Sequence, residues 1–139
     1  MTKPTPAARF FLDTNVLLYL FSGETGKADR AEALLLERPT ISVQVLNEFT
    51  SVALRKLSMG WDEVDESLAA IKASCAMESL TEETHETGCR LAQRYSLNVY
   101  DAMIAASALL AGCNVLYSED MQHGLLLEKR LRIVDPFKP

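Results

Sequence analysis

The chain has 139 residues and a formal net charge of −5, and 48% of its residues are hydrophobic while 24% are charged. This length suits one compact domain over residues 1–139, and the composition excludes both a disordered chain and a membrane-embedded one. The negative charge argues against a protein that binds nucleic acid through a broad basic surface, so a polyanionic ligand would need positive charge from another source.

The cysteines and the amino-terminal segment set further limits. Cys75, Cys89 and Cys113 form no CxxC pair, which argues against a disulfide framework and against a thiolate zinc site. The segment from Met1 to Arg9 lacks the apolar core of a signal peptide, and no apolar run is long enough to cross a bilayer. We therefore expect a cytoplasmic protein that has no membrane partner.

Short apolar runs predict the strands. The first run, Arg9 to Asp13, ends on a polar residue, which is typical of a buried parallel strand. Comparable runs lie at residues 40–43, 75–80, 114–117 and 131–134.

Between these runs the apolar residues recur at helical spacing. The stripes predict amphipathic helices that contain residues 28–35, 46–57, 64–71 and 88–95. Asp62 and Thr81 are predicted as N-caps, and Gly60 and Gly112 as residues that follow helix ends. The segment 101–111 is apolar on nearly every side, so we predict a central, buried helix there.

This alternation of strands and helices predicts the fold class. Such a chain pairs its strands in parallel through right-handed crossovers, which gives a three-layer α/β/α sandwich around a central, mostly parallel sheet. Ligands of these sheets collect at the carboxyl ends of the strands. Acidic residues at that edge are therefore candidates for chemistry.

Two acids come directly after predicted strands. Asp13 ends the first strand, where the alternative role is an N-cap for the next helix. Asp120 follows the strand that ends near Tyr117, where the alternative is a solvated turn. Glu119 could reach the same edge; we prefer Asp120 partly for its short side chain and mainly for a resemblance described below.

Two more acids lie near helix starts. With Asn98 as the N-cap, Asp101 is the third residue of the central helix, where a carboxylate can favour the helix dipole and still reach the sheet edge. Glu48 lies in the first turns of the helix after the second strand; on its own it would be an ordinary surface glutamate. Its long side chain could extend toward Asp13.

Together these acids predict a divalent metal site. Carboxylates gathered at one sheet edge repel one another at neutral pH unless cations neutralise them. Oxygen ligands without thiolate or imidazole favour Mg²⁺ or Mn²⁺ over zinc or copper. Such ions bind substrate phosphate and activate water for phosphodiester hydrolysis. The predicted catalytic and metal-binding residues are Asp13, Glu48, Asp101 and Asp120.

Four segments in chain order carry a resemblance to a known family: Phe11–Leu17, Ser42–Glu48, Tyr100–Ala108 and Leu116–Met121. With these segments the chain resembles the PIN-domain nucleases and, among them, the VapC-like toxins of bacterial toxin-antitoxin pairs. The likeness extends from about Arg9 to Pro136. After Asp120 the chain departs from many relatives, which have a short segment leading to Phe.

The resemblance implies an endoribonuclease that uses Mg²⁺ or Mn²⁺, is neutralised by an antitoxin protein and forms a homodimer. It assigns the family's four acidic positions to Asp13, Glu48, Asp101 and Asp120. It also implies that Ser118 is a hydroxyl residue supporting the site and that Asn15 lies at the site's edge.

Two rival hypotheses remain. The segment from Asp13 to Val16 is similar to the opening motif of haloacid-dehalogenase-like phosphatases, in which the first Asp is a covalent nucleophile; Asn15 replaces the second acid of that motif. Alternatively, the chain could be a catalytically idle module that binds RNA or protein. Among basic residues, Arg55, Lys56, Arg90 and Arg94 could hold phosphates or could be solvated surface charge.

Overall fold

The computed structural model describes residues 9–139. Residues 1–8 lie outside the described residues. The prediction of one domain over residues 1–139 and the prediction that Met1 to Arg9 has no apolar leader core both include these residues.

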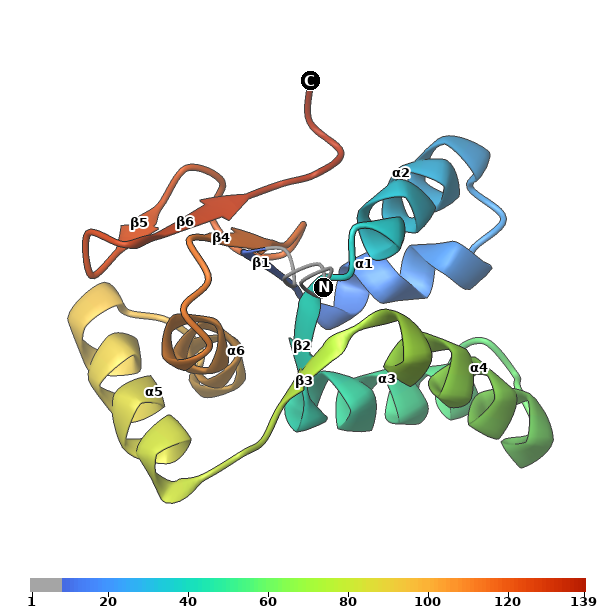
Figure 1. The fold of residues 1–139 in the computed structure, drawn as a ribbon, viewed down its shortest axis with the longest axis horizontal. Helices are drawn as coiled ribbons and strands as arrows, with labels where there is room; N and C mark the ends of the chain where they lie inside the picture. The colour runs from blue at the N-terminus through green and yellow to red at the C-terminus, as the bar shows by residue number, and fades with distance from the viewer. Residues whose placement is uncertain (1–8) are drawn as a thin grey trace, which may run out of the picture.

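One six-stranded sheet forms the centre of the structure, in the order β3-β2-β1-β4-β6-β5 (Figure 1). All neighbouring strands pair in parallel except β5, which runs antiparallel to β6. The strands are β1 (Phe10–Leu12), β2 (Thr40–Ser42), β3 (Ala76–Glu78), β4 (Val115–Tyr117), β5 (Leu126–Leu127) and β6 (Leu131–Val134).

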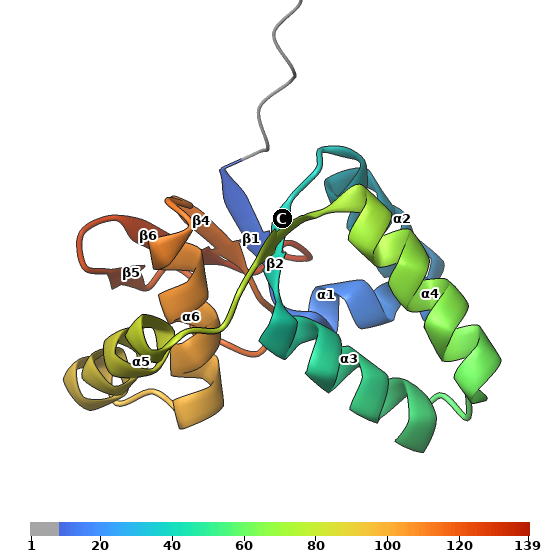
Figure 2. The same ribbon diagram turned by 60° about the horizontal axis from the view of Figure 1, so that its bottom comes forward.

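Helices cover both faces of this sheet. In both views α5 and α6 lie on one side of the strands, and α1 to α4 lie on the other (Figures 1 and 2). The helices are α1 (Thr14–Leu18), the 3₁₀ turn η1 (Tyr19–Phe21), α2 (Thr25–Leu36), α3 (Val43–Arg55), α4 (Trp61–Ser74), α5 (Glu82–Tyr95) and α6 (Val99–Leu110). The predicted α/β/α sandwich with a mostly parallel sheet is thus confirmed.

The order of the strands creates a crevice beside β1. The chain leaves β1 for β2 on one side, and reaches β4 on the other side only after it has formed β3. Connections that depart in opposite directions open a crevice at the carboxyl ends of the two central strands. Asp13 and Ser118 directly follow these two strands.

The central helix α6 is buried as predicted. Its alanines at positions 102, 105, 106 and 108 are nearly inaccessible to solvent, which lets it approach both the sheet and α5. The approach to α5 is close at Gly88, where an added Cβ atom would clash with the Met103 sulfur. Ser107 is also fully buried, and its hydroxyl has no hydrogen-bond partner among the described residues.

Some predicted boundaries were wrong. Helix α4 begins at Trp61 with Gly60 as its N-cap residue, so Asp62 lies inside the first turn and Gly60 precedes a helix instead of following one. Strand β5 was not predicted. Thr81 does cap α5 through its hydroxyl, and Gly112 follows α6 with a φ of +78°, as expected.

Within residues 9–139, none of the helices has both the length and the apolar character that crossing a bilayer requires.

Candidate active site

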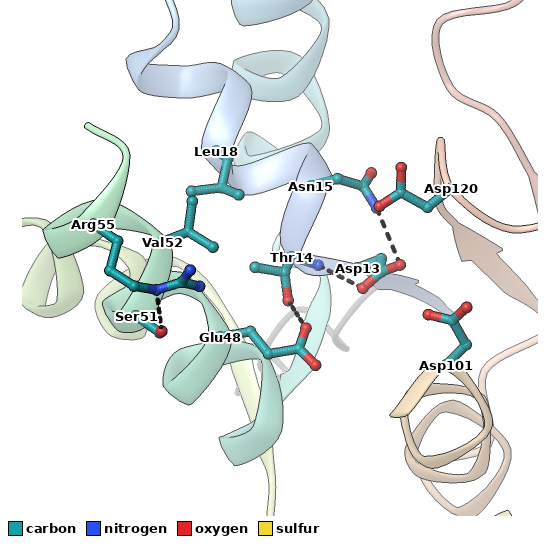
Figure 3. Close-up of a pocket in the computed structure, with 10 residues that line it drawn as sticks. All are labelled: Asp13, Thr14, Asn15, Leu18, Glu48, Ser51, Val52, Arg55, Asp101 and Asp120. Atoms are coloured by element: carbon teal, nitrogen blue, oxygen red, sulfur yellow. Dashed lines mark hydrogen bonds between the residues drawn. The ribbon is translucent and has the colours of Figure 1, made fainter. Parts of the chain in front are cut away.

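The four predicted acids line one cavity of about 250 Å³ at the carboxyl edge of the sheet. Asp13 joins β1 to α1, Glu48 belongs to α3, Asp101 to the first turn of α6, and Asp120 follows β4. Their carboxylates are directed into the same space from these separate elements (Figure 3). Acids distant in sequence therefore converge, as the topology predicted.

Asp13 is the most buried of the four, with 4% of its surface exposed. Its carboxylate accepts hydrogen bonds from the Thr14 backbone N–H (2.7 Å), the Ser118 hydroxyl (2.8 Å) and the Asn15 amide (3.1 Å). Burial is the main cause that raises the pKa of Asp13 to about 6; the bonds from Ser118 and Thr14 oppose the rise, and the charge of Asp101 adds to it. Asp13 is thus both the N-cap of α1 and a component of the cavity.

Ser118 connects the ends of the two central strands. Its hydroxyl donates to Asp13 and accepts the backbone N–H groups of Asp120 and Met121, each at 3.2 Å. The side chain is fully buried. The residue therefore orients Asp13 and shapes the turn that carries Asp120.

Asn15 makes a second connection across the same crevice. Its amide nitrogen lies 3.1 Å from an Asp13 oxygen and 3.3 Å from an Asp120 oxygen, while its carbonyl oxygen accepts the Glu119 N–H at 3.0 Å. One side chain thus touches both acids that follow the central strands.

Two residues that orient Glu48 were not predicted. The Thr14 hydroxyl donates to one Glu48 oxygen at 2.7 Å, and the Gln44 amide donates to the other at 3.0 Å. Gln44 precedes Glu48 by four residues in α3, so the helical spacing could have revealed it. The contact from Thr14 joins two different elements and leaves no comparable signal.

Asp101 lies at the predicted third position of α6. Asn98 caps this helix by accepting the Tyr100 N–H at 2.9 Å. Burial, followed by the charges of Asp120 and Glu48, raises the pKa of Asp101 above its ordinary value. Both Asp13 and Asp101 therefore experience the negative charge of their neighbours.

Asp120, the acid preferred from the sequence, and its neighbour Glu119 have different surroundings. The Glu119 carboxylate accepts a hydrogen bond from the Tyr19 hydroxyl and forms an ion pair with Lys27 at 2.7 Å. Asp120 lines the acid cavity and is exposed. Asp120 is thus the acid of this pair that is available in that cavity.

Among the candidate cations, Arg55 lines the acid cavity, where its Nε donates to Ser51 at 3.1 Å. Arg94 forms an ion pair with Glu128 at 2.9 Å, and Arg90 donates to Thr87. His123 has a structural role, because its Nδ1 accepts the backbone N–H of Asp135.

The residues fit a divalent cation in chemical type. All four acids offer oxygen ligands, and the raised pKa of Asp13 reflects burial together with the charges of Asp101 and Glu48, which a cation would offset. Across residues 9–139, however, no three His, Cys, Asp or Glu side chains are already arranged around one position suitable for a metal ion.

Comparison of the chain with known proteins identifies its family. The PIN domain family model matches residues 10–124. No curated protein matches the chain by sequence.

Several solved structures share the fold. A toxin-antitoxin complex from Klebsiella pneumoniae has a TM-score of 0.70 at 23% identity, with 93% of this chain and 98% of that chain covered. VapC20 from Mycobacterium tuberculosis, named as a Sarcin-Ricin loop cleaving toxin, has a TM-score of 0.65 at 19% identity, covering 80% and 89% of the two chains. VapBC2 from Rickettsia felis, bound to a promoter DNA fragment, has a TM-score of 0.65 at 17% identity, covering 91% and 98%. Because the family model spans most of residues 9–139, the chain belongs to the PIN domain family.

Proposed function

We propose that this protein is a metal-dependent endoribonuclease that hydrolyses RNA phosphodiester bonds and is the toxin of a toxin-antitoxin pair. The observation that carries the proposal is the convergence of four acids in one cavity at the crevice beside β1. The same residues are the proposed catalytic and metal-binding groups: Asp13, Glu48, Asp101 and Asp120.

The chemistry follows from the way these acids are held. Mg²⁺ or Mn²⁺ bound in the cavity would activate water and neutralise charge on the phosphate. Asp13 must lose its proton to act as a ligand, and the bonds that it accepts from Ser118 and Thr14 lower the pKa and so favour that form. Thr14 and Gln44 hold one oxygen each of Glu48. The chain thereby limits the rotation of two acids before substrate arrives.

The surroundings of Asp13 argue against the phosphatase alternative. The only basic side chain among the described residues that line the cavity is that of Arg55, and no lysine lines it. Asn15 stands where a phosphatase would have its second acid, and an amide cannot accept and release a proton in that role. A water molecule is therefore the favoured nucleophile.

The electrostatics argue against a catalytically idle module. Keeping Asp13 charged near neutral pH costs the folded state free energy, because burial and neighbouring acids raise its pKa to about 6. A module that only binds would be more stable without these acids. Their presence in one cavity fits a role that requires their charge.

The substrate and partners are proposed from the comparisons. VapC20 is named as a Sarcin-Ricin loop cleaving toxin, and the Klebsiella and Rickettsia neighbours are a toxin-antitoxin complex and VapBC2. These names support RNA as the substrate and an antitoxin protein as the partner. For a homodimer, the support is an exposed apolar surface: Leu80 and Tyr100 line one shallow cavity and, with Val99, are 41 to 64% exposed. We propose a cytoplasmic location for the pair.

The direct test is cleavage of total RNA and of labelled oligonucleotides with Mg²⁺, Mn²⁺ or EDTA. We expect cleavage only with metal, and a loss of about 100-fold or more in Asp13→Asn and Asp101→Asn, since even supporting residues of metal sites cost 10- to 100-fold. Asp65→Asn, which changes an exposed acid of α4, is the matched control. Cleavage that survives EDTA, or an aspartyl-phosphate trapped on Asp13, would contradict the proposal.

A further inference from the structure

A second cavity of about 400 Å³ adjoins the acid cavity. The two cavities share four lining residues: Asn15, Leu18, Val52 and Asp120. The side chains of Leu18 and Val52 lie next to each other at the border (Figure 3). A polymer whose reacting phosphate occupies the acid cavity can therefore extend into this second space.

The wall of the second cavity is largely apolar. Leu18 of α1 and Val52 of α3 form part of it, together with Leu57, which follows α3. Tyr19 also lines the cavity, and its ring contacts the Phe137 ring, whose centroid lies 4.8 Å away in an edge-on arrangement. The surface is thus formed before any ligand binds.

Most polar groups of the cavity already have partners within the chain. The Glu119 carboxylate contacts Lys27 and Tyr19. The Ser22 hydroxyl donates to the Tyr19 carbonyl and accepts the Glu24 N–H. A ligand placed here would find apolar contacts and few free hydrogen-bonding groups.

Two polar side chains of this cavity are less occupied: the Asp120 carboxylate, which among the described residues accepts only from the Asn15 amide at 3.3 Å, and Lys56. Lys56 lines the second cavity, is exposed, and forms no ion pair with a described residue. Arg55, its neighbour in sequence, lines the acid cavity instead. Each cavity thus has one basic side chain at its wall, in a protein whose net charge is −5.

We propose that the second cavity holds an unpaired nucleotide next to the scissile phosphate, with its base against Leu18, Val52 and Leu57 and its phosphate facing Lys56. This assignment rests on the proposed ribonuclease activity. Bases bind apolar and aromatic surfaces through their faces, which every base has, while lysine attracts the phosphate. Because the cavity offers few free polar groups, it selects an accessible base more than a particular base.

The assignment has a consequence for the substrate. A base can enter a cavity only when it is not stacked and paired within a helix, as in loops and single strands. We therefore expect cleavage within unpaired segments, with weak preference for base identity at the position that occupies the second cavity.

An abasic scan tests this assignment. A single-stranded oligonucleotide with one defined cleavage site is prepared with an abasic residue at each position flanking the scissile phosphate, and kcat/KM is measured. For the parent protein we expect one position at which base removal lowers kcat/KM by about 10-fold or more, in line with the loss of one stacked base. Leu57→Trp, which fills the cavity, should remove this difference between intact and abasic substrates.

Lys56→Gln provides a second variant that leaves the cavity wall intact. We expect it to raise KM several-fold and to lower the slope of log affinity against log salt by about 0.7, the value for one phosphate contact with a single strand. Lys72→Gln, on the exposed face of α4, is the control and should leave both quantities unchanged. Circular dichroism and thermal melting establish that each variant is folded.

The outcomes separate this inference from the function on which it rests. If the parent protein cleaves no RNA, the proposed function fails. If it cleaves RNA but tolerates every abasic position, or cleaves the same segment equally well inside a hairpin stem, the nucleotide assignment is overturned while the function stands. Unchanged cleavage in both Leu57→Trp and Lys56→Gln would likewise overturn it, and would leave the cavity to a protein partner.

Discussion

In the metal-free protein, Asp13 caps a helix with its carboxylate although its buried surroundings disfavour the charged form of that group. Its carboxylate caps α1, yet burial raises its pKa from 3.8 to about 6. Between those two pH values the folded state binds more protons than the unfolded state, so folding is favoured at low pH and this contribution is lost as the pH rises through about 6. The charged form that the proposed metal site requires is thus the less stable form of the metal-free protein.

Replacing Asp13 by Asn should remove this pH dependence. The quantity to compare is the free energy of unfolding of Asp13→Asn minus that of the parent, both in EDTA. We expect this difference to increase by up to about 3 kcal/mol from pH 4 to pH 7, since each pKa unit corresponds to about 1.4 kcal/mol. Urea titrations at several pH values measure the difference. Parallel pH profiles for the two proteins would show that Asp13 ionises normally in the folded state.

Thr14 should affect activity through Glu48. Its hydroxyl lies 2.7 Å from a Glu48 oxygen, and Val has nearly the same shape without the donor. We expect Thr14→Val to lower kcat/KM roughly 10-fold, with weaker metal affinity, as for other residues that orient metal ligands. Thr14→Ser keeps the hydroxyl and should retain most activity; an equal loss in both variants would point to packing instead of the hydrogen bond.

At this scale the sequence predicted the acids better than the residues that orient them. Asp13, Asp101 and Asp120 could be found because each lies next to the end of a strand or the start of a helix. The preference for Asp120 over Glu119 came mainly from the family resemblance, because the contact that distinguishes them joins Glu119 to Lys27, 92 residues earlier in the chain. Hydrogen bonds between elements, such as that from Thr14 to Glu48, have no local pattern.

Among the elements, α6 carries Asp101 on an almost wholly apolar helix. Its burial against the sheet and α5 fixes the start of the helix beneath the crevice, so the apolar pattern itself positions the acid. Ser107 interrupts that pattern with a buried hydroxyl that lacks a partner. Such a group costs stability because it has lost its bonds to water.

Ser107→Ala should therefore stabilise the protein. We expect the free energy of unfolding to rise by about 1 kcal/mol, from removal of the unsatisfied hydroxyl and from the higher helix propensity of Ala. Ser74→Ala is a suitable comparison, because Ser74 is only partly buried and its hydroxyl bonds to the Ala70 carbonyl; it should change little. Chemical denaturation measures both, and a destabilised Ser107→Ala would mean that the hydroxyl has a partner.

The spacing of apolar residues predicted the longer helices, whereas the ends of the helices depend on backbone capping contacts. The apolar stripe of α4 was clear, but the position of Asp62 suggested a cap two residues beyond the actual one. Gly60 is the N-cap residue because its backbone is extended and its carbonyl accepts the Val64 N–H at 3.0 Å. Strand β5 has two residues and pairs through its backbone with β6, so it has too little sequence to form a pattern.

For the molecule as a whole, metal binding should couple directly to stability. A cation that binds only the folded state raises the free energy of unfolding by about 2.7 kcal/mol when its free concentration is about 100 times Kd. We expect Mg²⁺ or Mn²⁺ to raise the melting temperature of the parent but not that of an Asp13→Asn, Asp101→Asn double variant. Equal shifts in both proteins would indicate binding elsewhere on the acidic surface.

The parallel sheet also determines when the cavity can form during protein synthesis. Strand β4 lies between β1 and β6, and the Ser118 backbone N–H donates to the carbonyl of Val134 in β6. A ribosome therefore releases Asp13 early, while the turn that bears Asp120 gains its hydrogen bond to β6 only after residues 131–134 have left the exit tunnel. Until then the nascent polypeptide lacks one of the contacts that hold the acid cavity together, so we expect the proposed nuclease activity to arise only near the completion of synthesis.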